Sequence, residues 1–164
     1  MTPLRRAGRG RLPDGSVVVW SVSEGTRGRR WREIHRTPAG DLITSLLLET
    51  HPDDRFAHIE LSTTAGLLTL HPEADGTLHG NVVTAAGVRH VAGLPWTPRS
   101  VVLVEGSVLA SASAARTVAG NVADGVRITL DLDVIPVHET VAVEVDAEGL
   151  PVLDDAASWP LEAG

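Results

Sequence analysis

The chain has 164 residues, of which 43% are hydrophobic and 21% charged, and its formal net charge at pH 7 is −7. A chain of this length forms one domain that buries most of its unfolded surface, so its core needs no disulfide or metal. Cysteine is absent, which excludes disulfides, thiolate nucleophiles and cysteine-ligated zinc. We therefore expect a single domain over residues 1–164 that uses no cofactor.

Charge is distributed unevenly along the sequence. All 14 basic residues are arginine, and residues 1–36 carry a net charge of +6 against −13 for the remainder. The absence of lysine excludes Schiff-base chemistry and the lysine of phosphate-binding P-loops. The basic segment has no aromatic platform beyond Trp20 and Trp31, and the acidic remainder repels phosphate. We expect a basic N-terminal arm over residues 1–15 and no nucleic-acid partner.

The sequence predicts a cytoplasmic protein without a membrane span. No segment reaches the ~18 apolar residues that a transmembrane helix needs. The first arginines are like the start of a signal peptide, but the apolar segment 17–20 is too short for the hydrophobic part of one.

Alternating and β-branched segments predict many short strands. They cover residues 16–23, 30–37, 41–50, 55–62, 67–71, 77–83, 87–92, 100–105, 125–137 and 140–146. The Asp75-Gly76 pair is a strong hairpin signal. Segment 41–50 is apolar on both faces and needs cover on both, so we expect a homodimer. The tail, residues 150–164, has two prolines and few apolar side chains, and we expect it to be loosely held.

One helix is predicted near residues 107–119. Ser107 is a suitable N-cap, and the pair Gly120-Asn121 is a stop signal. The apolar residues that recur at helical spacing are Val108, Ala112, Ala115 and Ala119. The predicted fold is therefore all-β and mainly antiparallel, with a curled sheet that forms a spiral β-roll or half-barrel and holds one helix.

Histidine and carboxylate side chains are the candidates for catalysis. His58 and Glu60 share one strand face, and His90 ends another strand. In a curled sheet such a face can line a cavity where a carboxylate orients a histidine. The same pattern is typical of a strand face in contact with water, so both interpretations remain open. No histidine pattern has the spacing of a known metal motif, and we expect no metal site.

Tryptophan and arginine side chains are the candidates for ligand binding. Trp96 lies between two prolines and shortly before Arg99, so an indole and a guanidinium are held on one turn. His90 ends the preceding strand, and Trp31 shares a strand face with Glu33 and His35. The candidate ligand-binding residues are Trp31, His90, Trp96 and Arg99. The alternatives are that Trp96 plugs the end of a barrel and that Trp31 shields a sheet edge.

One part of the sequence resembles a known family. The segment Asp75-Gly-Thr-Leu-His-Gly80 is followed by residues 87–100, which contain a Thr97-Pro98 pair, and by the apolar segment 101–104. This order of a DG hairpin, a short strand, a Thr-Pro turn and a further strand resembles the glycolipid-binding family of bacterial spiral β-rolls. The resemblance implies a β-roll fold and, as an expectation, a lipid-like ligand.

The expected function is the binding of an amphipathic or lipid-like small molecule in the concavity of the β-roll. Two alternatives remain. The first is a small enzyme, such as a cyclase, isomerase or hydrolase, that uses a histidine and a carboxylate in the same cavity. The second is a dimeric interaction module without a ligand. The fold alone does not decide among them.

Overall fold

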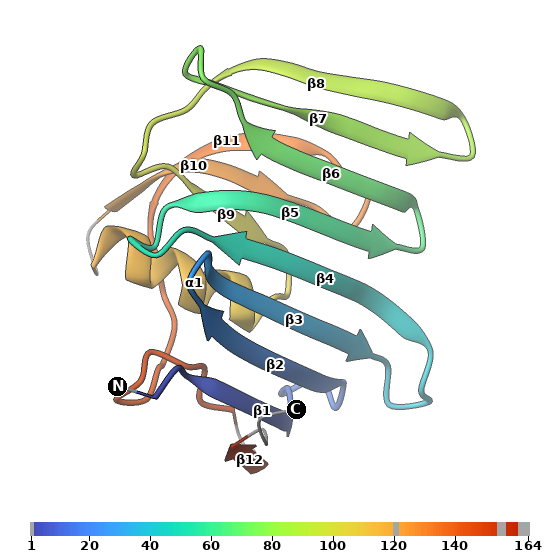
Figure 1. Cartoon of the computed structure of the whole chain (residues 1–164). Helices are drawn as coiled ribbons and strands as arrows, with labels where there is room; N and C mark the ends of the chain where they lie inside the picture. The colour runs from blue at the N-terminus through green and yellow to red at the C-terminus, as the bar shows by residue number, and fades with distance from the viewer. Residues whose placement is uncertain (1, 120–121, 154–156, 161–164) are drawn as a thin grey trace.

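The computed structural model describes residues 2–119, 122–153 and 157–160 of the chain. It contains one large antiparallel sheet that curls around a second layer, and this layer consists of one helix and a small sheet (Figure 1). The strand order of the large sheet is β12-β1-β2-β3-β4-β5-β6-β7-β8, so the sheet is a meander with the last strand added beside the first. Among the described residues its edge strands, β12 and β8, do not pair with each other, so the sheet is open.

The strands of the large sheet follow one another through short turns. Their bounds are β1 Arg5–Arg11, β2 Val17–Gly25, β3 Gly28–Arg36, β4 Leu42–Thr50, β5 Phe56–Thr63, β6 Gly66–Pro72, β7 Thr77–Thr84, β8 Gly87–Pro95 and β12 Ala157–Pro160. Most alternate between a buried and an exposed side chain, as in β2 and β3, because one face of the sheet packs on the core. The β2–β3 turn is tight, and Gly28 takes a φ of 115° there that favours glycine.

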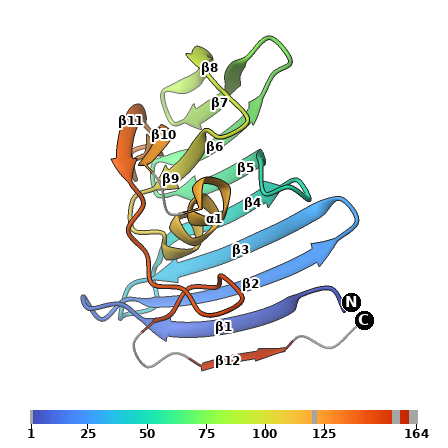
Figure 2. The same ribbon diagram turned by 90° about the vertical axis from the view of Figure 1, so that its left-hand side faces the viewer.

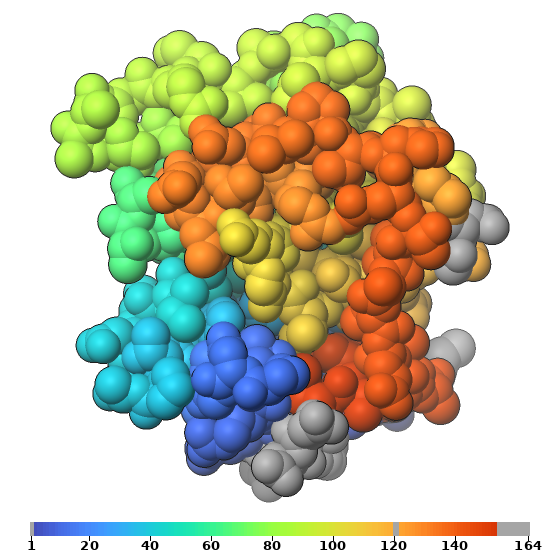
Figure 3. Space-filling view, turned by 180° about the vertical axis from the view of Figure 1, so that it is seen from behind, coloured from blue at the N-terminus to red at the C-terminus, as the bar shows by residue number. Residues whose placement is uncertain are grey.

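The second layer covers the inner face of the large sheet. It consists of β9 Val101–Val104, α1 Val108–Val118, β10 Val122–Ile128 and β11 Val134–Thr140. Strands β9 and β10 pair in parallel, and α1 is the crossover connection that such a pairing needs. Strands β10 and β11 are antiparallel. Figure 2 shows α1 on the inner side of the large sheet. From behind, the second sheet and the segment after it cover this side (Figure 3).

Helix α1 begins and ends as the sequence indicates. The Ser107 hydroxyl accepts a hydrogen bond from the Ala110 amide at 3.0 Å and so caps the N-terminus. Ala119 ends the helix in the left-handed conformation, with a φ of 51°. The predicted stop signal, Gly120-Asn121, lies outside the described residues. The small side chains Ala110, Ala112 and Ala114 are buried, which lets α1 lie close to its neighbours.

One hydrophobic core joins the two layers. It contains Trp20 and Trp31 from the large sheet, Leu109 from α1 and Ile128 from β10. Helix α1 and the small sheet thus fill the concave side that the sequence predicted as a ligand cavity. The concave side is therefore filled by core side chains from both layers.

The predicted fold class is confirmed: the described residues are mainly antiparallel β, with a curled sheet and one helix near residues 107–119. The prediction of one strand over residues 125–137 is wrong, because the chain turns at Thr129–Asp133 and forms β10 and β11. Leu132 takes a φ of 66° in this turn, and its amide donates to the Thr129 carbonyl at 2.9 Å. The predicted strand over 140–146 is also wrong, since β11 ends at Thr140.

Both ends of the chain take part in the large sheet. The predicted N-terminal arm contains β1, which pairs along its whole length with β2. In the predicted loose tail, Leu150 and Leu153 are buried in the core and β12 pairs with β1. The backbone hydrogen bonds of residues 5–11 are therefore made within the sheet.

Candidate functional site

An open cleft with an apolar floor lies where three turns of the fold meet. Its volume is about 590 Å³. The first turn joins β4 to β5 and supplies His51 and Arg55; β5 itself supplies Phe56 and Ala57. The other lining residues come from the β6–β7 turn and the β8–β9 turn: Pro72, Glu73, Ala74, Gly76, Trp96, Thr97 and Pro98. We refer to this hollow as the Trp96 cleft.

The floor of the Trp96 cleft is an aromatic pair. The rings of Phe56 and Trp96 meet edge to face, with 5.4 Å between their centroids and 63° between their planes. Trp96 is only 8% exposed, so most of its indole packs into the core and a small part remains open to the cleft. The pair therefore has a structural role in addition to any contact with a ligand.

Short-range hydrogen bonds hold the turn that carries Trp96. The Trp96 amide donates to the Gly76 carbonyl at 2.9 Å, which ties this turn to the β6–β7 turn. Within the turn, the Thr97 amide donates to the Ser100 hydroxyl and the Ser100 amide to the Thr97 carbonyl, both at 3.0 Å. Pro95 and Pro98 further restrict the backbone. The cleft wall is therefore fixed in position before any ligand arrives.

Charged side chains surround the apolar floor. Arg55 lines the cleft, and its Nε donates to Asp53 Oδ2 at 2.6 Å in an exposed ion pair. Across the cleft, Glu73 Oε1 lies 2.8 Å from His71 Nε2. The lining of the cleft thus combines an aromatic floor with a cationic residue, Arg55, and a carboxylate, Glu73.

The structure separates the predicted ligand-binding residues. Trp96 lines the cleft, and Arg99 on the same turn lines a different, smaller hollow beside Val122 and Asp124. Trp31 is buried on β3. His90 is exposed on β8 and lies 2.5 Å from the Asn81 side chain through its Nδ1. Of the four residues, Trp96 alone lies in the Trp96 cleft.

The catalytic candidates lie on the outer face of the large sheet. His58 Nε2 is 3.2 Å from Glu60 Oε1, so the expected contact between them exists, but both side chains are partly exposed. His90 is on β8, three strands away in the sheet order. Among the residues that the structure describes, no three His, Asp or Glu side chains gather where one metal ion could bind.

A buried carboxyl lies beneath the N-terminus of α1. Glu33 on β3 is 1% exposed, and its Oε2 accepts a hydrogen bond from the Leu109 amide at 3.1 Å. Its other oxygen, Oε1, has no hydrogen-bond partner in the described part of the chain. Burial raises the pKa of Glu33 to about 7, although the hydrogen bonds from the Leu109 amide and the Ser107 hydroxyl oppose this.

A second buried polar group joins the β1–β2 turn to β3. The Ser16 hydroxyl lies 2.5 Å from Asp14 Oδ1 and 2.7 Å from His35 Nε2. Because a carboxylate only accepts, the hydroxyl donates to Asp14 and accepts from the His35 N–H. Burial lowers the pKa of His35, which agrees with a neutral ring. Ser16 stands between the histidine and the aspartate, so this is not the order of a catalytic triad.

Sequence reasoning found Trp96 but missed the other walls of the cleft. Arg55 and Phe56, at the start of β5, and Pro72, at the end of β6, are distant in sequence from Trp96, and only the strand order brings them together. The buried Glu33 did have a signal, because it shares a strand face with Trp31 and His35, and a large aromatic residue marks the core side of a strand.

Comparisons with known proteins give no family for this chain: no family model, no curated protein and no solved structure matches it. The resemblance to the glycolipid-binding family therefore stays an expectation. Within the described residues, no helix has the length and apolar character needed to cross a membrane.

Proposed function

We propose that the protein binds a small amphipathic molecule in the Trp96 cleft. The observation that carries this proposal is the combination of a preformed cleft of about 590 Å³ with an aromatic floor and charged rims. Pockets for small ligands typically enclose ~300–1,000 Å³ and have apolar walls with a few polar groups that fix orientation. The cleft therefore has the size and the composition of a ligand site.

The walls define which part of the ligand goes where. An alkyl or ring portion would pack on Ala57, Pro72 and the open edge of Trp96. An anionic or hydroxylated head would lie toward Arg55, whose guanidinium can donate to it in addition to its bond with Asp53. The proposal differs from the sequence-based expectation in one respect: the site is the rim cleft, because the concave side of the sheet is occupied by α1 and the small sheet.

A fluorescent fatty acid tests the proposal. Ala57→Trp adds bulk on the wall of the cleft and leaves the Phe56–Trp96 pair in place, so it should weaken binding of a dansylated undecanoic acid at least about tenfold, the equivalent of ~1.4 kcal/mol. Ala86→Trp, at an exposed position in the β7–β8 turn, is the matched control and should bind as the wild type does. Arg55→Gln should weaken the acid probe more than the corresponding alcohol.

Two results would contradict the proposal. The first is an unchanged affinity of the Ala57→Trp variant, which would place the probe elsewhere. The second is an equal loss in both tryptophan variants, which would mean that added bulk acts through stability. Circular dichroism of each variant establishes that it is folded before its affinity is compared.

The alternative functions stay predictions. An enzyme that uses His58 and Glu60 would work on the outer sheet face, where the two partly exposed side chains contact each other. A dimeric module would cover Ile43 and Leu47, which lie on the outer face of β4 and are partly exposed in the monomer. The open Trp96 cleft differs from both arrangements in its aromatic floor.

A further inference from the structure

The uneven charge of the sequence becomes a basic surface in the fold. The pairing registers place alternate residues of β1, β2 and β3 on the outer face, opposite the side that packs on α1. This outer face carries six exposed arginines, three from β1 and three from β3: Arg5, Arg9, Arg11, Arg30, Arg32 and Arg36. We call it the arginine face.

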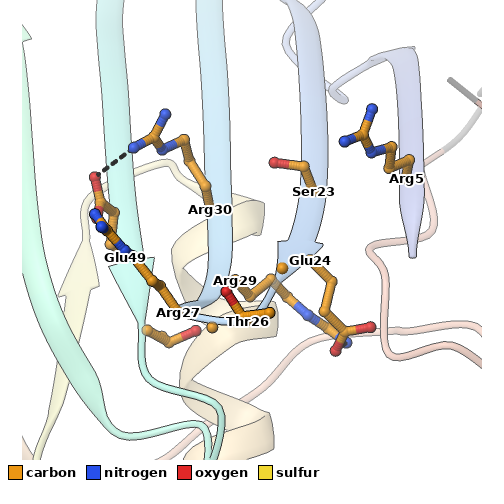
Figure 4. Close-up of a pocket in the computed structure, with 11 residues that line it drawn as sticks. Arg5, Ser23, Glu24, Thr26, Arg27, Arg29, Arg30 and Glu49 are labelled. Atoms are coloured by element: carbon orange, nitrogen blue, oxygen red, sulfur yellow. Dashed lines mark hydrogen bonds and ion pairs between the residues drawn. The ribbon is translucent and has the colours of Figure 1, made fainter. Parts of the chain in front are cut away.

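Few of these positive charges are compensated within the chain. Arg30 pairs with Glu49 on β4 at 3.4 Å, and this is the only ion pair recorded for the six arginines in the described part of the chain. Arg11 and Arg36 donate to the backbone carbonyls of Gly15 and Gly40. Figure 4 shows Arg5, Ser23 and Arg30 extending on one side of their strands, while Arg29 and Glu24 lie on the other.

The charges form a two-dimensional array. Alternate residues along a strand are roughly 7 Å apart, and β1 and β3 are separated by about 10 Å with β2 between them. A second, apolar component lies inside the array. Val19, which is 47% exposed, stands between Arg9 on β1 and Ile34 on β3, and Val17 stands between Arg11 and Arg36.

We propose that the arginine face docks the protein on an anionic lipid bilayer surface. The head groups of such a surface present negative charge in two dimensions, which complements the two-dimensional array of arginines. The aliphatic side chains between the arginines suit the boundary between head groups and acyl chains. A nucleic-acid strand fits less well, because its phosphates form a single row and the described side chains of this face include no aromatic ring on which bases could stack. The inference does not depend on the Trp96 cleft.

Vesicle flotation tests this inference on the full chain. The protein should bind vesicles of phosphatidylcholine with added phosphatidylglycerol at about 0.1 M salt and dissociate from them at about 0.5 M salt. It should not bind vesicles of pure phosphatidylcholine. Arg9→Gln with Arg32→Gln removes two arginines that form no ion pair with the described residues, and should reduce binding at least tenfold. The control, Arg89→Gln with Arg127→Gln, removes the same charge elsewhere and should bind like the wild type.

Three results would overturn the inference. One is failure of the wild type to bind the anionic vesicles, and another is an equal loss for the test and control variants. The third is tighter binding to a single-stranded oligonucleotide than to the vesicles at the same salt concentration. Circular dichroism separates a binding loss from unfolding, and the fatty-acid titration of the Trp96 cleft should be unaffected by the Arg9 and Arg32 substitutions.

Discussion

Replacing Glu33 by glutamine should change how the stability of the protein depends on pH. In the folded state burial raises the pKa of this carboxyl from 4.5 to about 7. Protonated Glu33 therefore contributes stability that is fully present below pH 4.5 and is lost as the pH rises to about 7. The interval between the two pKa values corresponds to about 3 kcal/mol of unfolding free energy.

The glutamine variant lacks this titration but keeps an oxygen that can accept from the Leu109 amide. The free energy of unfolding of each protein is measured by urea denaturation with tryptophan fluorescence. The difference between the variant and the wild type should shift by about 3 kcal/mol in favour of the variant as the pH rises from 4 to 8, because only the wild type loses stability through Glu33. His35 acts in the opposite sense, because burial lowers its pKa and its contribution is lost as the pH falls. Since His35 is present in both proteins, the difference between the two curves isolates Glu33.

Glu60→Gln is the matched control, because it removes a half-exposed carboxylate on the outer face of β5. Its difference from the wild type should stay within about 0.5 kcal/mol across the same pH range. Parallel curves for the wild type and the Glu33→Gln variant would refute the reasoning, since they would mean that the carboxyl titrates alike in the folded and unfolded chain.

Three further predictions concern packing and assembly. Ala112→Leu should cost roughly 1–3 kcal/mol in urea denaturation, because Ala112 lies on the buried side of α1 and is fully buried, and a neutral result would mean that this side of the helix borders open space. Trp96→Ala should lower the free energy of unfolding by about 3–5 kcal/mol through loss of its contact with Phe56, whereas an unchanged denaturation midpoint would show that the indole is not part of the core. The homodimer expected from the apolar outer face of β4 should appear in sedimentation velocity at micromolar concentration, and Leu47→Glu on that face should dissociate it. A monomeric wild-type protein would contradict the prediction.

The strands of the large sheet could be predicted because each has one face in the core and one in water. In β2, Val18, Trp20 and Val22 are buried while Val19 is exposed, and this alternation is visible in the sequence. Strand β1 escaped prediction because its glycines, alanine and arginines have little strand preference. It forms a strand because the edge of β2 supplies backbone partners along its whole length.

The wrong prediction of one strand over residues 125–137 has a local cause. Apolar and polar residues alternate without interruption through the turn at Thr129–Asp133, so periodicity alone predicts one strand there. The turn closes through local hydrogen bonds to Thr129, from the Asp133 amide to its hydroxyl at 3.1 Å and from the Leu132 amide to its carbonyl. Leu132 adopts a positive φ without being glycine, and no sequence signal announces that.

The candidate site was only partly predictable. The prolines around Trp96 indicated a rigid turn with an aromatic side chain, and the structure has such a turn. The partner ring, Phe56, starts a strand that is distant in sequence, and its contact with Trp96 depends on the curl of the sheet. Arg99 was grouped with Trp96 because of its proximity in sequence, but the turn directs the two side chains to different hollows.

The most direct measurement of the central claim is an NMR titration of the ¹⁵N-labelled protein with dodecanoate. The account predicts that the shift changes gather on the Trp96 cleft, at the amides of Ala57, Ala74 and Thr97 and at the indole N–H of Trp96. The indoles of Trp20 and Trp31, which are buried in the core, should not shift. Shift changes centred on the core of β3 or on the small sheet, with the cleft unchanged, would contradict the account.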